Sequence, residues 1–379
     1  MKFILIYSKI FNLKDDKDIL SQIGGVQRYM YELAKLLKNN FNNEVILIQF
    51  GNEELYLQYE GLKIYQYNYK NTKELIENLR AYKFISMEDI IIWGSDTLSI
   101  KTEFKSISIQ HGIACDYFSR ESKLQKFCYK IPLLALGYKF LQLLKSYKVF
   151  ENTQYRVCVD YNYLNWYRTL NIYRNNMDNI HVIPNFTKIP EFKKRIENEK
   201  IIISFARRFH HKRGAKLLCE VADNLLTNFS SLEFWFAGEG EELNYVENLK
   251  QKYPMNVKIT KFSQNSTFDY HQKVDIAVIP TIASEGTSLS LLEAMASNCA
   301  VVCTNIGGMT NIILDEFNGL LVNPEYEDLK QALTKLINSY ELRNKLSNNA
   351  YHTVRDSFSL KIWEKKWLAL IHKVIENHD

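Results

Sequence analysis

The sequence predicts an α/β protein built from two domains, each with a parallel sheet at its centre. Its 379 residues suit two or three domains of ordinary size. Short apolar runs alternate with helical segments in both halves of the chain. The two halves are separated by Lys188–Lys200, a charged stretch that contains Pro190 and has the composition of an interdomain linker.

Four apolar runs in the first half have the length expected of buried parallel strands. The first run is too short for a signal peptide, and charged residues follow it where a cleavage site would lie, so we expect a cytoplasmic protein. Apolar residues recur at helical spacing over Gln27–Leu37, which predicts a helix after the first strand. The predicted strands are Lys2–Tyr7, Glu44–Gln49, Asp89–Trp93 and Ser106–Gln110.

The second half repeats the same alternation with six apolar runs. Helices are expected between them, for example over Ala215–Leu226 and Ser288–Ser297. The last segment, Leu360–Glu376, has the pattern of a long amphipathic helix. The predicted strands are Ile201–Phe205, Leu232–Ala237, Val257–Thr260, Asp275–Pro280, Cys299–Cys303 and Gly319–Val322.

Composition excludes several classes of function. Hydrophobic residues make up 46% of the chain and charged residues 24%, as in a globular protein with ample core. The formal net charge of +5 and the lack of a finger, basic-helix or RNP-like signature argue against nucleic acid as a partner. The six cysteines form no Cys-x-x-Cys pair, which predicts free thiols in a reducing compartment.

Two carboxylates seven residues apart, Glu285 and Glu293, form the strongest chemical signal. They follow the strand Asp275–Pro280, and ligands of open parallel sheets bind beyond the carboxyl ends of strands. Gly286 permits a tight turn, and Thr287 or Ser288 is a suitable helix cap, so that the helix start could hold a phosphate. Glu293, in the second turn, leans back toward the same ligand, where its carboxylate would accept sugar hydroxyls. The alternative is a capped core helix with one solvated glutamate.

Basic and glycine-rich segments follow other predicted strands. Arg208 and Arg213 flank a turn after Ile201–Phe205, where two guanidiniums could clamp a diphosphate, with Lys212 as an alternative contact. Gly24 and Gly25 lack the third glycine of the dinucleotide fingerprint, but they still let backbone N–H groups approach a phosphate. Solvated loop charges and a flexible turn are the respective alternatives.

A histidine, His111, follows the strand Ser106–Gln110 and precedes a glycine. At a strand end, its imidazole could donate a hydrogen bond to a sugar hydroxyl or stabilise charge. A structural or solvated loop histidine is the alternative. The Asp-x-Asp sequence at Asp16–Asp18 lies in a polar loop, and we predict no metal site.

These motifs together resemble the retaining family 4 glycosyltransferases, which have the GT-B fold. The Glu-x7-Glu signature over 285–293 carries the resemblance, and Ser204–Gly214 is similar to the family's Gly-Arg-Leu…Lys-Gly segment. The family usually has Lys where this chain has Arg213. Further matches in the specific second half are Phe236–Gly240, Gly307–Gly308 and Asn318–Pro324, and the first half adds the short, individually weak Gly24–Arg28 and Gln110–Ile113.

The resemblance implies two Rossmann-like domains facing a cleft, with a C-terminal helix that crosses back to the first domain. We expect an acceptor-side domain at 1–187 together with 358–379, and a nucleotide-sugar donor domain at 188–357. The implied reaction moves a sugar from a nucleoside diphosphate sugar to a glycan or lipid-linked acceptor, with retention, without a metal, in cell-surface polysaccharide synthesis. The alternatives are a non-catalytic nucleotide-sugar-binding partner subunit and a nucleotide-sugar epimerase.

The site residues are likewise transferred from the resemblance. Glu293 should hold the ribose and Glu285 the donor sugar, while the arginines and the helix start stabilise the leaving diphosphate. The predicted catalytic residues are His111, Glu285, Arg208 and Arg213. The predicted donor-binding residues are Gly24, Gly25, Arg208, Arg213, Glu285, Gly286, Thr287, Ser288, Leu289 and Glu293.

The segment Ser122–Phe150 combines six lysines with many large apolar residues and contains no acidic residue. This composition is typical of an interfacial segment that contacts an anionic membrane from the cytoplasmic side. An ordinary helix packed on the first domain, with its lysines in water, is an equally good interpretation of the sequence.

Overall fold

The computed structural model describes residues 1–13, 24–113, 116–117, 122–173, 177–191, 200–263, 266–283 and 285–376. Asp16, Asp18 and Ser284 lie outside the described residues. The chain divides into two compact units, and each is described by itself. Unit 1 comprises Met1–His111, Tyr117–Ile183 and Lys366–Asp379, and unit 2 comprises Gly112–Asp116 and Pro184–Lys365.

Unit 1 contains an eight-stranded sheet in the order β3-β4-β2-β1-β5-β6-β7-β8. All neighbouring strands are parallel except the β3–β4 pair at one edge. The chain runs outward from β1 in both directions, so the order reverses between β1 and β5, where ligand crevices of such sheets form. The strands are β1 (Lys2–Tyr7), β2 (Glu44–Phe50), β3 (Leu55–Tyr59), β4 (Leu62–Tyr67), β5 (Ile90–Trp93), β6 (Lys105–Gln110), β7 (Tyr155–Cys158) and β8 (Ile180–Val182).

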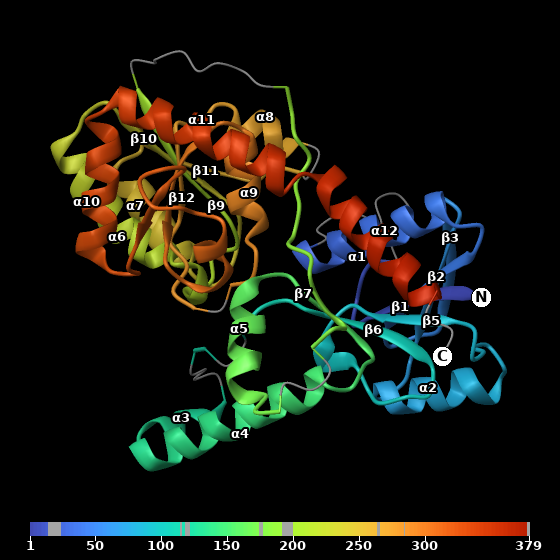
Figure 1. Ribbon diagram of the computed structural model, residues 1–379. Coiled ribbons are helices and arrows are strands. Elements are labelled where there is room, and N and C mark those ends of the chain that lie inside the picture. The colour runs from blue at the N-terminus through green and yellow to red at the C-terminus, as the bar shows by residue number, and fades with distance from the viewer. Residues whose placement is uncertain are drawn as a thin grey trace. The chain divides into compact units, whose positions relative to one another are not determined.

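Helices cover both faces of this sheet (Figure 1). α2 (Thr72–Ala81) buries Leu75, Ile76 and Leu79 against the strands. α1 (Gly25–Asn40) covers the opposite face together with the end of α12 (Leu360–Glu376), where Trp367 donates its indole N–H to the Tyr29 hydroxyl at 2.8 Å. The predicted return of the last helix to the first domain is therefore confirmed. The remaining helices of unit 1 are α3 (Lys123–Tyr129), α4 (Pro132–Phe150) and α5 (Tyr161–Leu170).

Unit 2 contains a six-stranded, fully parallel sheet in the order β11-β10-β9-β12-β13-β14. The strand order reverses between β9 and β12, and ligands of such sheets bind beyond the carboxyl ends of the strands at this point. The strands are β9 (Ile201–Ala206), β10 (Leu232–Ala237), β11 (Val257–Thr260), β12 (Ile276–Ile279), β13 (Ala300–Thr304) and β14 (Leu320–Val322).

Two apolar layers hold the sheet of unit 2 between helices. α6 (Ala215–Asn228), α7 (Leu243–Lys252) and α10 (Tyr326–Ile337) pack into one layer. α8 (Thr267–His271), α9 (Leu289–Ala296) and α11 (Tyr340–Ser357) pack into the other. The two parallel sheets confirm the predicted α/β class.

Four strands of unit 1 were not predicted from the sequence. β3 and β4 form an antiparallel edge pair whose Tyr-rich alternation differs from a continuous apolar run. β7 contains Arg156, whose side chain is buried among aromatic rings and bonds to the Tyr167 hydroxyl at 3.1 Å. A buried arginine interrupts the apolar pattern, so pattern reading misses such a strand.

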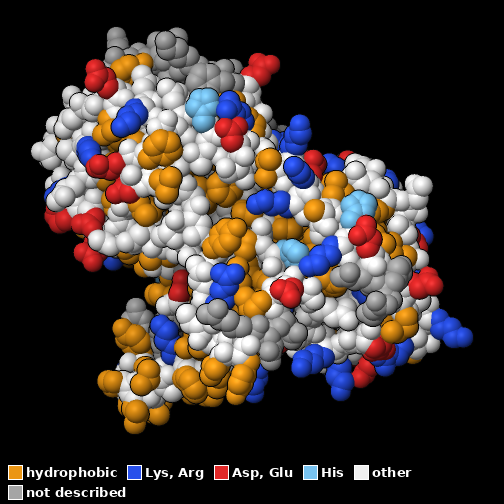
Figure 2. Space-filling model, in the orientation of Figure 1, with side chains coloured by type: hydrophobic (Ala, Val, Ile, Leu, Met, Phe, Trp, Pro, Cys, Tyr) orange, Lys and Arg blue, Asp and Glu red, His pale blue; other side chains and the backbone are white. Residues whose placement is uncertain are grey.

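α3 and α4 form an arm in which apolar side chains face solvent. α3 buries none of its residues, and α4 buries only Phe150. Leu133, Leu136 and Leu141 are 78%, 67% and 64% exposed, and Figure 2 shows hydrophobic side chains gathered over this arm. Lys123, Lys126, Lys145 and Lys148 are exposed on the same two helices, and Lys130 is exposed between them. The end of α4 packs on unit 1, with Phe150 against Tyr163 and Tyr167, whereas the preceding part of the arm leaves its leucines exposed.

Candidate functional site

The carboxylate of Glu285 lies between two arginines at the reversal point of the sheet in unit 2. Arg207 directly follows β9, and Glu285 lies in the loop between β12 and α9. Glu285 Oε2 accepts hydrogen bonds from Arg207 Nη2 and from Arg213 Nη1. The side chains of Glu285 and Arg207 are 11% and 7% exposed, whereas that of Arg213 is 34% exposed.

A buried threonine connects the two loops. The Thr281 hydroxyl accepts a hydrogen bond from Arg207 Nη1 at 2.5 Å and lies 3.4 Å from Glu285 Oε2. Its carbonyl oxygen accepts a hydrogen bond from the Thr304 hydroxyl, at the end of β13, at 2.6 Å. Residues after three neighbouring strands thus hold the carboxylate and the guanidiniums in place.

Glycines allow the surrounding backbone to approach closely. Gly307 has a φ of 56°, and a Cβ there would lie 2.0 Å from the Glu285 carbonyl oxygen. Gly308 donates its N–H to that carbonyl at 2.9 Å. Gly214, with a φ of 78°, lies against Pro280 in the same manner. Each of these glycines is needed because a side chain would displace a loop of the site.

The net charge of this cluster is positive because two guanidiniums surround one carboxylate. Burial lowers the pKa of Arg213, and the Glu285 carboxylate opposes that shift. Arginine stays protonated in proteins at neutral pH, so both cations persist. A half-exposed cation beside a helix start suits an anion such as a phosphate.

The arginine that pairs with Glu285 from the end of β9 is Arg207, which sequence reasoning did not single out, whereas the predicted diphosphate ligand Arg208 stays a prediction. Arg208 is exposed, whereas the adjacent Arg207 makes the buried ion pair with Glu285. Two consecutive arginines at a strand end cannot be assigned by motif alone, because their side chains leave the strand in opposite directions. The strand register would have given a signal: Phe205 is buried, so the residue two positions further shares its orientation.

The residues at the start of α9 lie where the sequence predicted. Ser288 is the N-cap residue and Leu289 the first helical residue, but the Ser288 side chain makes no capping hydrogen bond. Instead, its hydroxyl lies 3.2 Å from that of Ser290. The Thr287 carbonyl accepts a hydrogen bond from Asn185 at 2.6 Å, and Glu293 is half-buried in the second turn.

His111 belongs to unit 1, where its geometry alters the expected role. Its Nε2 lies 2.9 Å from the Gly94 carbonyl oxygen at the end of β5. A carbonyl only accepts, so Nε2 carries the proton and Nδ1 is left as an acceptor. Burial lowers the pKa of His111 to about 4, against the opposing effect of that carbonyl. A neutral imidazole at neutral pH can accept a proton or hydrogen bond, but it supplies no positive charge.

Gly24 and Gly25 start helix α1 in unit 1. The Gly24 N–H donates to the Gln27 side chain, as the N-cap amide does in a capping box, but glycine has no side chain to complete the motif. Gly24 has an ordinary extended backbone, with a φ of −80°. This amide is therefore already engaged within unit 1 and is a weaker phosphate donor than the motif suggested.

Two units with mainly parallel sheets, each with polar loops at its reversal point, have the architecture of the GT-B fold. The structure is similar to that of sucrose-phosphate synthase from Thermosynechococcus elongatus, with a TM-score of 0.76, 14% identity and 98% coverage of both chains. It is also similar to Anabaena HepE in complex with UDP-glucose, with a TM-score of 0.70 and 12% identity, covering 98% of this chain and 100% of that one.

Residues 186–353 match the family model of the glycosyl transferases group 1. A relative is the poly(ribitol-phosphate) alpha-N-acetylglucosaminyltransferase of Staphylococcus aureus, which is 27% identical over 199 residues. That alignment covers 52% of this chain and 40% of the relative. The chain therefore spans less than half the length of this curated relative.

Proposed function

We propose that this protein transfers a hexosyl group from a nucleoside diphosphate sugar to a glycan or lipid-linked acceptor with retention of anomeric configuration. The observation that carries the proposal is the buried Glu285 carboxylate between Arg207 and Arg213 at the reversal point of the unit 2 sheet. This arrangement supplies cations for a diphosphate and an acceptor oxygen for sugar hydroxyls. Cell-surface polysaccharide synthesis is the process in which we place it.

The donor is proposed to bind unit 2 through its diphosphate and ribose. Arg213, which is the more exposed of the two paired arginines, contacts the diphosphate, and Glu293 accepts hydrogen bonds from the ribose hydroxyls. Anabaena HepE has been solved in complex with UDP-glucose, which supports a UDP-sugar as the first donor to test. Acceptor recognition is assigned to unit 1, where the neutral His111 accepts a hydroxyl hydrogen bond.

The proposed mechanism requires no metal ion. As the bond between the sugar and the β-phosphate breaks, negative charge builds on the diphosphate. Arg207, Arg213 and the start of α9 provide fixed positive potential for that charge. Activity after treatment with a chelator tests this point: turnover that is lost and then restored by manganese would contradict it.

Product analysis with a panel of nucleoside diphosphate sugars tests the proposed function. We expect donor cleavage with sugar transferred to an oligosaccharide or lipid-linked acceptor, and anomeric retention in the product by NMR. Glu285→Gln should lose turnover while the protein stays folded. An isomerised donor would instead indicate an epimerase, and tight donor binding without any product would indicate a non-catalytic binding subunit.

We further propose that the α3–α4 arm docks this enzyme on an anionic membrane surface. Among the residues that the structure describes, none lies in a helix both long and apolar enough to cross a bilayer. The arm instead carries exposed leucines beside six lysines, with no acidic residue in the sequence 122–150. Each lysine near an anionic surface contributes about 1 kcal/mol, and the apolar side chains add burial at the interface.

Co-sedimentation with liposomes tests the docking. Wild-type protein should bind vesicles that contain phosphatidylglycerol more strongly than neutral vesicles, and binding should weaken as salt rises. Changing Lys139, Lys145 and Lys148 to Glu should abolish this preference. The matched control changes the exposed lysines Lys250, Lys345 and Lys361 to Glu, which gives the same net charge without altering the arm. An equal loss of vesicle binding in both triple variants would contradict the proposal, as would a wild-type protein that is not enriched on anionic vesicles.

A further inference from the structure

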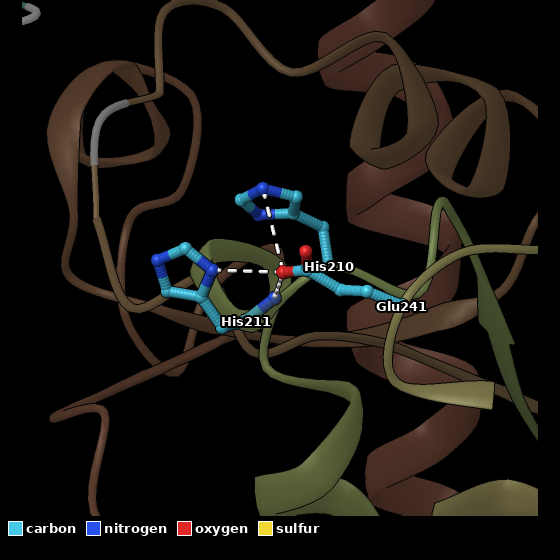
Figure 3. A group of neighbouring side chains, drawn as sticks. All are labelled: His210, His211 and Glu241. Carbon is cyan, nitrogen blue, oxygen red and sulfur yellow. Dashed lines mark hydrogen bonds and ion pairs between the residues drawn. The ribbon is translucent and has the colours of Figure 1, made fainter. Parts of the chain in front are cut away.

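Two histidines and a glutamate meet at the carboxyl edge of the unit 2 sheet, as Figure 3 shows. His210 and His211 lie in the loop between β9 and α6, and Glu241 lies in the loop between β10 and α7. His211 Nδ1 is 3.0 Å and His210 Nε2 is 3.5 Å from Glu241 Oε1. One ligand atom from each of the three residues lies within 4.8 Å of the others.

These distances fit the ligand shell of a small tetrahedral cation. Zinc bonds of about 2.0–2.2 Å place neighbouring ligand atoms about 3.3–3.6 Å apart. The two distances from Glu241 lie close to that range, and the two imidazole rings are 4.3 Å apart between centroids. The two histidine nitrogens lie within 4.8 Å of each other, and all three side chains are at least partly exposed, which leaves them room to rotate toward a shared ion.

The backbone around the three residues is already fixed. The Phe209 N–H donates to the Glu239 carbonyl at 2.7 Å, and the Glu242 N–H donates to the Phe209 carbonyl at 2.9 Å. These bonds tie the two loops together on either side of the three side chains. The entropic cost of assembling the ligands is therefore lower than it would be in two free loops.

We propose that His210, His211 and Glu241 bind a divalent transition-metal ion, with zinc as the preferred species. Two imidazoles and one carboxylate leave a fourth position for water, and nitrogen ligands favour zinc over magnesium or calcium. The ion clamps the loop that carries Arg207 and Arg213 to the adjacent β10–α7 loop. This inference does not rest on the proposed function, because its three ligands are not among the residues assigned to the donor or the acceptor.

Two features limit the affinity of this site. The Lys212 N–H donates to His210 Nδ1 at 3.2 Å, whereas an imidazole that binds a metal through Nε2 carries its proton on Nδ1. Metal binding through His210 Nε2 therefore breaks the long hydrogen bond from the Lys212 N–H. The positive charges of Lys212 and Arg213 nearby also oppose a cation. We accordingly expect reversible binding that a chelator removes, rather than a permanently held ion.

Calorimetric titration of zinc into chelator-treated, tag-free protein tests the site. Wild-type protein should bind one equivalent at this site and show a higher unfolding midpoint with zinc, while magnesium should produce neither effect. Glu241→Gln should weaken binding by at least ~10-fold, and the double variant His210→Ala/His211→Ala should lose it. His352→Ala, at an exposed histidine on α11, is the matched control and should bind zinc normally.

The outcome that overturns the inference is unchanged zinc stoichiometry and affinity in the double variant. Loss of zinc binding in His352→Ala to the same degree would also overturn it, because that result indicates nonspecific binding to surface histidines. Glu241 is exposed and its removal leaves the core intact, so Glu241→Gln remains informative if the double variant fails to fold. Zinc binding that disappears in these variants while turnover persists leaves the proposed function untouched.

Discussion

Replacing Arg207 and Arg208 separately with methionine distinguishes two adjacent arginines whose surroundings differ. Arg207 is 7% exposed and bonds to Glu285 and to the Thr281 hydroxyl, whereas Arg208 is exposed. Methionine keeps most of the apolar volume and removes the charge. We therefore expect Arg207→Met to destabilise unit 2 and Arg208→Met to leave its stability unchanged.

The magnitude follows from the contacts that are lost. A hydrogen bond to a charged group contributes about 1.5–3 kcal/mol, and breaking a buried ion pair costs about 3–5 kcal/mol when one charge is left uncompensated. Glu285 keeps Arg213 as a partner, so its charge is not left alone. We expect a loss of about 3 kcal/mol for Arg207→Met, and a change within about 0.5 kcal/mol for Arg208→Met.

Hydrogen–deuterium exchange of peptides from β9 and β12 is the appropriate assay, because a chain of two units need not unfold in one step. Exchange in these strands should accelerate in Arg207→Met and remain as in wild type in Arg208→Met. Equal effects in the two variants would refute the assignment of the ion pair. Donor affinity measured on the same samples tests whether Arg208 binds the donor. Weaker donor binding by Arg208→Met, with exchange unchanged, would identify Arg208 as an exposed donor ligand.

Three further predictions concern single residues. Glu293→Ala should weaken donor binding at least ~10-fold by calorimetry, since it removes charge-assisted bonds; wild-type affinity would contradict the ribose assignment. Glu285→Gln should bind a nucleoside diphosphate without a sugar at least as tightly as wild type, because the change frees two guanidiniums. The same variant should lose turnover. Weaker binding of the nucleoside diphosphate would contradict this prediction. The pKa of His111 is lowered to about 4 in the folded chain. Between pH 6.5 and pH 4 the unfolded chain therefore binds a proton that the folded chain does not. The free energy of unfolding consequently decreases as the pH falls through this range. That loss reaches at most about 3 kcal/mol and should be smaller in His111→Gln, as measured by denaturation at pH 7 and pH 4.5; equal losses would contradict the assignment.

The sheet of unit 2 was predictable from the sequence because its central strands β12 and β13 are buried on both faces and the other strands keep an apolar core-facing side. All six appear as short apolar runs, and β10 and β11 have the predicted bounds. Unit 1 was harder because its edge strands follow different rules. β3 lies at the end of the sheet and alternates exposed with half-buried residues, while β7 hides the charge of Arg156 among aromatic rings. Periodicity detects burial, and it fails where burial is partial or where a charge is buried with partners.

The site was predictable as a set of loops, but its pairing was not. The Glu-x7-Glu motif identified Glu285, whereas no motif indicates which of two consecutive arginines points at it. Thr281 was missed altogether, because a buried threonine after a strand has no sequence signature. Its role appears only when β9, β12 and β13 are neighbours, so that Arg207, Thr281 and Thr304 form one chain of hydrogen bonds.

The ion pairs of Glu285 imply that the free site is partly self-neutralised. Two guanidiniums and one carboxylate leave one net positive charge, so an incoming diphosphate meets an electrostatic attraction that Glu285 already reduces. A sugar hydroxyl that hydrogen-bonds to Glu285 Oε2, the oxygen that both arginines share, would compete with them and release them toward the phosphates. The phosphates of a nucleoside diphosphate sugar would then meet guanidiniums that are no longer paired, whereas those of a bare nucleotide would not. On this reasoning, the carboxylate couples recognition of the sugar to stabilisation of the leaving group, which a site made of arginines alone would lack.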